Sequence, residues 1–229
     1  MNPFGRRLFF VSTLVLRPAV LPAETLAAVQ ARMDASAPTF KTLSANVRKV
    51  THTAVINDDS TEIGVIYMKR VRAGELRLKI DFSKPDIRSV AFAGKKYEMY
   101  LPKIQTVQEF DLGKQGSLVD QFLLLGFGTS AKDLAKSYQM KLADEEQVNG
   151  IRTSRIELLP KSGKIKEHLT KVEMWIPEGE GYPIQQKFHQ PSGDYYLTTY
   201  TDLKWNPPLA DEMLRLRLPP GTRREFPQK

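Results

Sequence analysis

The sequence predicts a mainly β (α+β) protein, with a single antiparallel sheet of about ten to twelve strands and a few short helices. Apolar and charged residues alternate in several short segments, most clearly at residues 76–82, where the sequence is LRLKIDF. Glycine, proline, asparagine and aspartate recur at short intervals between these segments, as expected for hairpin turns. No repeat or linker divides the 229 residues, so we expect one domain after any leader.

Composition excludes several classes of protein. Hydrophobic residues make up 41% and charged residues 26% of the chain, which is ordinary for a globular protein. There is no cysteine, and therefore no disulfide or thiolate chemistry. The formal net charge of +8 comes from bases that alternate along strands and are not interleaved with aromatic residues, so we expect no nucleic-acid partner.

The N-terminus has the pattern of a secretory signal peptide. Arg6 and Arg7 precede an apolar run at residues 8–16, and small residues follow near Ala23. The apolar run is shorter than the ~20 residues of a membrane span. We therefore predict a signal peptide at residues 1–23 and an exported domain at residues 24–229, with no cysteine that could carry a lipid.

The first part of the mature chain predicts one helix and then paired strands. Apolar residues share one face of an amphipathic helix at residues 24–36. A first strand is predicted at residues 40–53, a turn at 57–60, and a hairpin at 64–82 with its tip at 73–74.

Arg70 is placed unusually within that hairpin. Strand alternation puts it on the same face as Ile66 and Met68, whereas Lys69 is on the other face. A buried guanidinium requires hydrogen-bond partners because an unpaired buried charge is costly. The alternative is that Arg70, near the strand end, extends its charged head into water.

A second helix is predicted at residues 117–126, beginning with the capping pair Ser117 and Asp120. Its residues are apolar nearly all round, which indicates burial on most sides. It is either a core helix that plugs the sheet or a movable lid over an apolar cavity. A further capping signature, Ser130 with Asp133, predicts a helix that ends near Tyr138.

The second half returns to strands. They are predicted at residues 151–159, 169–176, 184–190, 195–205 and 214–218. Residues 160–166 are predicted to form a basic turn, and residues 209–214 one helical turn.

No set of catalytic residues is evident. His52, His168 and His189 lack the spacing of metal ligands. Glu109 and Asp111 share a strand face, but two such carboxylates are typical of a solvated face. The sequence contains no phosphate-binding loop and no nucleophile elbow. We therefore expect no catalytic residue, metal or cofactor, and no enzymatic activity.

The order of several short motifs resembles the LolA family, the periplasmic carriers of outer-membrane lipoproteins. The resemblance spans nearly all of the mature chain, starting with Leu26 and Met33 of the first helix. The other motifs are residues 38–45 (PTFKTLSA), 64–70 (GVIYMKR), 84–86 (KPD), 94–102 (GKKYEMYLP) and 218–221 (LPPG).

The resemblance implies an unclosed β-barrel, lidded by short helices, that encloses a cavity for acyl chains. It favours the lid interpretation of residues 117–126. The residues then expected to line the cavity are Ile66, Met68, Leu76, Leu78, Ile80, Val90, Phe92, Leu118, Phe122 and Leu125. The implied partners are acylated lipoproteins, an inner-membrane ABC-type release complex and an outer-membrane receptor, with the carrier a periplasmic monomer.

The resemblance also gives Arg70 a role. In the family, the arginine of this Lys-Arg pair hydrogen-bonds the lid backbone and holds the empty carrier closed, so Arg70 is the expected lid latch. The chain departs from the family pattern at residues 71–74 (VRAG), where the family usually has proline. An alternative within the same fold is a binder of another lipid or an envelope-stress sensing module.

Overall fold

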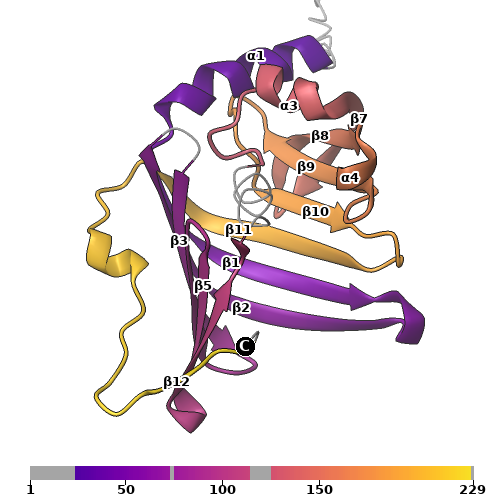
Figure 1. Cartoon of the computed structure of the whole chain (residues 1–229). Helices are drawn as coiled ribbons and strands as arrows, with labels where there is room; N and C mark the ends of the chain where they lie inside the picture. The colour runs from indigo at the N-terminus through magenta and orange to yellow at the C-terminus, as the bar shows by residue number, and fades with distance from the viewer. Residues whose placement is uncertain (1–23, 73–74, 114–124, 228–229) are drawn as a thin grey trace, which may run out of the picture.

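The computed structural model describes residues 24–72, 75–113 and 125–227. The predicted signal peptide lies outside these residues, and so does the predicted lid apart from Leu125 and Gly126. Within them the chain forms one 12-stranded sheet, in the order β12-β6-β5-β4-β3-β2-β1-β11-β10-β9-β8-β7. Figure 1 shows this sheet as a curved, unclosed surface with short helices across one end, which confirms the predicted fold class.

Neighbouring strands are antiparallel, except that β12 pairs parallel to β6. The strands are β1 (Thr42–Thr53), β2 (Asp58–Arg72), β3 (Glu75–Lys84), β4 (Arg88–Ala93), β5 (Lys96–Leu101), β6 (Thr106–Asp111), β7 (Tyr138–Val148), β8 (Ile151–Pro160), β9 (Lys171–Pro177), β10 (Gln185–His189), β11 (Tyr195–Trp205) and β12 (Arg223–Glu225).

The longer described helices begin after residues whose hydroxyls cap them. In α1 (Leu26–Ser36), the hydroxyl of Thr25 accepts a hydrogen bond from the amide of Ala28. In α3 (Ala131–Ser137), Ser130 accepts one from the amide of Asp133 at 3.0 Å, which confirms the capping signature. Short helical turns complete the set: α4 (Gly163–Lys166), η1 (Ala37–Thr39), η2 (Ala54–Ile56), η3 (Pro102–Ile104) and η5 (Asp211–Leu214).

The concave face of the sheet carries two apolar clusters. Val29 of α1 and Leu134 of α3 pack with Met174 of β9 in the first, so these two helices cover the strands from β7 to β10. In the second, Phe40 and Phe127 pack on the side chains of β1, β2, β3 and β4. The sheet therefore has the apolar side and the polar side that strand alternation predicts.

The segment from the end of β11 to the start of β12, residues 206–222, crosses the convex side of the sheet, and we call it the C-terminal strap. Figure 1 shows it, in yellow, running outside β3 and away from α1. It is fixed by an ion pair in which Nζ of Lys69 lies 2.5 Å from a carboxylate oxygen of Asp211. The strap then adds β12 to the edge strand β6.

Several predicted boundaries are wrong. Residues 57–60 are not one turn: the turn is η2 followed by Asn57, whose φ of 48° reverses the chain, and β2 starts at Asp58 because strand pairing extends to the hairpin tip. Residues 214–218 form no strand. They lie in the strap, where alternation of leucine and arginine reflects an extended chain with Leu214 buried against the sheet and Arg215 in solvent.

Several elements were not predicted, among them β12, β7 and α4. Strand β7 was missed, although Tyr138, Met140 and Leu142 alternate with polar residues at its start. Its acidic second half, which is largely exposed, obscured the pattern. The predicted basic turn at residues 160–166 contains α4, which Ser162 caps by accepting a hydrogen bond from the amide of Ile165.

Candidate ligand-binding face and its latch

The residues predicted to line a cavity come together on the concave face. Direct cross-strand pairs join Ile66 to Ile80 and Met68 to Leu78, and β4 places Val90 beside Ile80 and Phe92 beside Leu78. Leu76 is paired with Arg70 on the same face. Leu118 and Phe122 lie outside the described residues.

All of these described side chains are buried or half-buried. Ile66, Met68, Leu76, Leu78 and Phe92 belong to the second apolar cluster, with Ile80 packed against it. Leu125 instead belongs to the first cluster, under α1 and α3. The candidate face therefore lies on β2, β3 and β4, and Leu125 lies at its boundary with the neighbouring core.

Arg70 brings a charge into this apolar face. Its Nη1 donates to the carbonyl of Ala37 at 3.2 Å, and its Nη2 donates to the carbonyl of Gly128 in a short hydrogen bond. The guanidinium carbon lies 5.3 Å from the ring centroid of Phe40, within cation–π distance. Burial lowers the pKa of Arg70 below its ordinary value. Arg70 thus connects β2 to the end of α1 and to the segment that follows the predicted lid.

That segment is a turn at residues 125–128, which we call the anchor turn. Its other end is held by Gln186 of β10, whose Nε2 donates to the carbonyl of Leu125 at 2.5 Å. The Gln186 side-chain oxygen accepts a hydrogen bond from the buried hydroxyl of Tyr200 at 2.8 Å. Phe127 packs edge-on against the Tyr200 ring. Two side chains of the sheet, Arg70 and Gln186, therefore fix both ends of the anchor turn.

The sequence predicted that Arg70 shares the apolar face, but it did not single out Gln186. Gln186 lies two positions before Phe188 and therefore on the same, apolar face of β10. A polar residue at such a position could have been recognised from the sequence, as Arg70 was. An aromatic group at the end of β11 was also missed. Trp205 stacks on Tyr182 with ring centroids 4.5 Å apart and packs on Phe40 at 5.0 Å. This group supports the Phe40 ring beneath Arg70.

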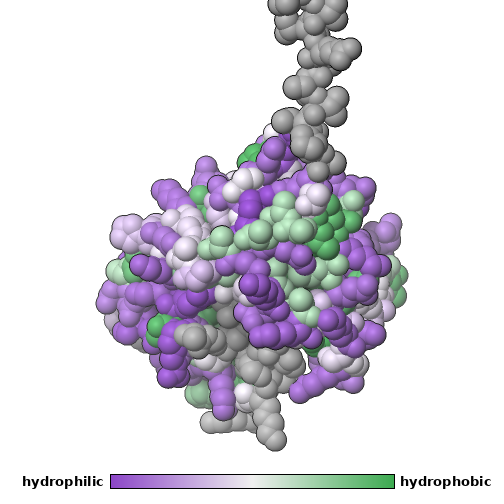
Figure 2. Space-filling view, turned by 90° about the horizontal axis from the view of Figure 1, so that it is seen from above, coloured by the Kyte–Doolittle hydropathy of each residue, from purple (hydrophilic) through white to green (hydrophobic). Residues whose placement is uncertain are grey.

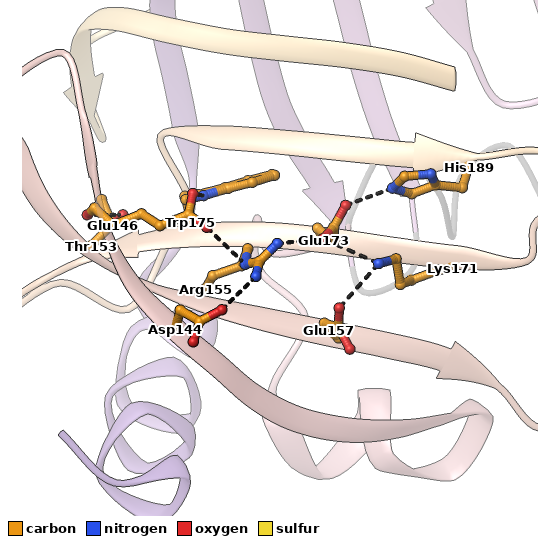
Figure 3. Close-up of polar contacts among 9 residues, drawn as sticks. All are labelled: Asp144, Glu146, Thr153, Arg155, Glu157, Lys171, Glu173, Trp175 and His189. Carbon is orange, nitrogen blue, oxygen red and sulfur yellow. Dashed lines mark hydrogen bonds and ion pairs between the residues drawn. The ribbon is translucent and has the colours of Figure 1, made fainter. Parts of the chain in front are cut away.

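The convex side of β8, β9 and β10 carries a separate charged network, shown in Figure 3. At its centre is Glu173, whose side chain is 5% exposed and accepts hydrogen bonds from Arg155 and Lys171. Nε2 of His189 lies 2.5 Å from its other oxygen. Burial opposes ionisation of Glu173, but its hydrogen bonds to His189 and Lys171 and their charges outweigh burial and lower its pKa. The network is internally paired, which indicates a role in stability.

The end of the molecule where α1 lies is mostly hydrophilic, with one band of apolar residues (Figure 2). Within the residues that the structure describes, no cluster of three or more histidine, aspartate or glutamate side chains is placed to hold a metal ion. No helix among them is both long enough and apolar enough to cross a bilayer.

Comparison with solved structures bears on the fold. No protein-family model and no curated protein matches the sequence. An uncharacterized conserved protein from Thermus thermophilus aligns over 87% of this chain and 98% of its own, with 11% identity and a TM-score of 0.53. MucB aligns over 83% of this chain, which spans only 62% of MucB, with 15% identity and a TM-score of 0.50.

A LolA superfamily protein from Nitrosomonas europaea aligns over 85% of this chain and 99% of its own, with 12% identity. Its TM-score is 0.40. At these identities the similarities concern the fold alone. The chain has the open, mainly antiparallel sheet that the sequence motifs predicted.

Proposed function

We propose that this protein is a periplasmic carrier that binds the acyl chains of lipoproteins against the concave face of β2, β3 and β4. It takes its cargo from an inner-membrane ABC-type release complex and delivers it to an outer-membrane receptor. The cargo enters when the anchor turn moves away from the sheet.

The contact between Arg70 and Gly128 is the observation that carries this proposal. A charged hydrogen bond contributes roughly 1.5–3 kcal/mol, and burial of an acyl methylene contributes about 0.8 kcal/mol. Burial of a few methylenes therefore offsets the loss of the latch. A latch of this strength keeps the empty carrier closed and still permits loading.

The test is replacement of Arg70 by leucine, with binding of a fluorescent fatty acid as the measurement. Arg70→Leu removes both carbonyl contacts, so the closed state loses stability and we expect the probe to bind about tenfold more tightly. Arg77→Leu is the matched control. Arg77 lies on β3 in register with Lys69, on the convex face, and its substitution should leave probe affinity unchanged. Equal affinities of Arg70→Leu and wild type would remove the latch from the proposal.

The similarity to MucB supports a second candidate, a module that senses or binds a protein partner. MucB has been solved in complex with a periplasmic part of MucA. Native mass spectrometry of the protein after gentle extraction separates the two functions. Co-purified lipoprotein or acyl lipid supports the carrier, whereas an unlipidated protein partner supports the binding module.

A further inference from the structure

A polar cavity of about 340 Å³ lies between the convex face of the sheet and the C-terminal strap, on the opposite side from the candidate acyl-binding face. Its volume is at the small end of the range for ligand pockets. Its polar lining residues are Tyr67, Lys79, Asp81, Ser89, Tyr100 and Arg217.

Lys79 is the unexpected residue in this cavity. It belongs to the polar face of β3, which strand alternation predicts to be in water, yet it is only 8% exposed. Its ammonium lies 2.8 Å from a carboxylate oxygen of Asp81. An ammonium has three donors, so this contact leaves two donors for other partners.

The charges of the lining do not balance. Asp81 is already satisfied, because the hydroxyl of Ser89 donates to its second oxygen at 2.6 Å. Among the described residues, no carboxylate forms an ion pair with Arg217, which reaches the cavity from the strap. Lys79 and Arg217 against Asp81 leave an excess of one positive charge.

The donors of this cavity converge from two separate parts of the chain. Lys79 and the phenol of Tyr67 come from directly paired positions of β3 and β2, whereas Arg217 comes from the strap. An oxyanion accepts hydrogen bonds from an ammonium, a guanidinium and phenol hydroxyls together. A ligand with one negative charge would neutralise the excess and connect the strap to the sheet.

We propose that this cavity is a binding site for a small molecule that carries a singly charged oxyanion, either a carboxylate or a phosphodiester. The site is independent of acyl-chain binding, because its residues face the other side of the sheet. Bound ligand holds the strap through Arg217, in addition to the ion pair between Lys69 and Asp211.

The test is a titration of the full mature chain with acetate and with dimethyl phosphate, followed by NMR of the ¹⁵N-labelled lysine ammonium groups and by calorimetry. We expect a saturable shift of the Lys79 Nζ signal with at least one probe. Lys79→Met should abolish binding, and Arg217→Gln should weaken it about tenfold or more. Arg215→Gln is the matched control, because Arg215 is an exposed strap residue two positions away and does not line the cavity.

A vesicle experiment identifies the source of the anion. Co-flotation of wild type, but not of Arg217→Gln, with phosphatidylglycerol vesicles and not with phosphatidylcholine vesicles supports a lipid phosphodiester. Binding of the soluble probes without flotation supports a soluble ligand. The proposal is overturned if neither probe shifts the Lys79 signal of the wild type, or if Arg217→Gln binds as Arg215→Gln does. Both of these outcomes can be measured even if Lys79→Met does not fold, because they involve only the wild type, Arg217→Gln and Arg215→Gln.

Discussion

Gly128→Ala tests the latch from the side of the anchor turn. Gly128 has a φ of +79°, and a Cβ at this position would overlap Nη2 of Arg70 and lie 2.7 Å from Cδ1 of Phe40. The substitution therefore acts in two ways: it strains the backbone, and it displaces the guanidinium from the carbonyl of Gly128.

The two effects have separable magnitudes. A left-handed conformation costs a residue other than glycine about 1–2 kcal/mol. Loss of the charged hydrogen bond from Arg70 costs about 1.5–3 kcal/mol. We therefore expect Gly128→Ala to lower the free energy of unfolding by about 2.5–5 kcal/mol.

Gly150 provides a matched control. Its φ of +80° is nearly the same, but a Cβ there would have no neighbour within 4 Å. Gly150→Ala should therefore show the backbone cost alone, about 1–2 kcal/mol. Urea denaturation of both variants measures the difference, which contains the energy of the displaced latch and of the contact with Phe40.

A double-mutant cycle completes the test. In an Arg70→Leu background, Gly128→Ala should lose the part of its cost that comes from displacing the guanidinium, about 1.5–3 kcal/mol. Additive effects of the two substitutions, or equal costs for Gly128→Ala and Gly150→Ala, would show that Arg70 does not hold the anchor turn.

The remaining predictions concern the rest of the described structure. Gln186→Met should destabilise the protein by about 2–4 kcal/mol in urea denaturation, since it leaves the carbonyl of Leu125 and the hydroxyl of Tyr200 without their partner. Tyr200→Phe should lower the free energy of unfolding by only about 1 kcal/mol. A larger loss for Tyr200→Phe than for Gln186→Met would contradict the role of Gln186 in holding the anchor turn. Glu173→Gln should cost about 2 kcal/mol at neutral pH, because it removes the carboxylate that pairs with Arg155 and Lys171. The folded-state pKa of Glu173 is lowered, so its contribution is present above the unfolded pKa of about 4.3 and is lost as pH falls through the lower folded pKa. Unfolding free energies from pH 7 to pH 3 should therefore fall more steeply for wild type than for Glu173→Gln, and parallel curves would refute the role of this carboxylate.

Local patterns were sufficient for much of the fold. The alternation at residues 76–82 predicted β3 and its two faces, because each side chain of a strand points opposite to the next. The serine at position 130 predicted the start of α3, because a capping hydroxyl binds an amide that the helix leaves free. The same alternation placed Arg70 on the apolar face of β2, because it lies an even number of positions from Ile66 and Met68.

Features that depend on distant pairing could not be predicted in this way. Lys79 has the sequence environment of a solvent-facing residue, yet it is buried beside a cavity that the strap, more than 120 positions later, helps to enclose. The carbonyls that receive Arg70 belong to Ala37 and Gly128, and no local pattern marks an acceptor of this kind. The alternating leucines at 214–218 were misassigned as a strand. An extended segment that lies on a sheet also buries every second side chain, so its sequence alternates as that of a paired strand does.

An open sheet has two borders where backbone groups invite another chain, and here each border is protected differently. At one, the short strand β12 pairs with residues 106–108 of β6, so the outermost strand there is only three residues long. At the other, the register of β7 shifts between Leu142 and Glu145, and carboxylates crowd the irregularity. An incoming strand would meet a bent border lined by charged, ion-paired side chains. The molecule can therefore remain unclosed without polymerising through its borders.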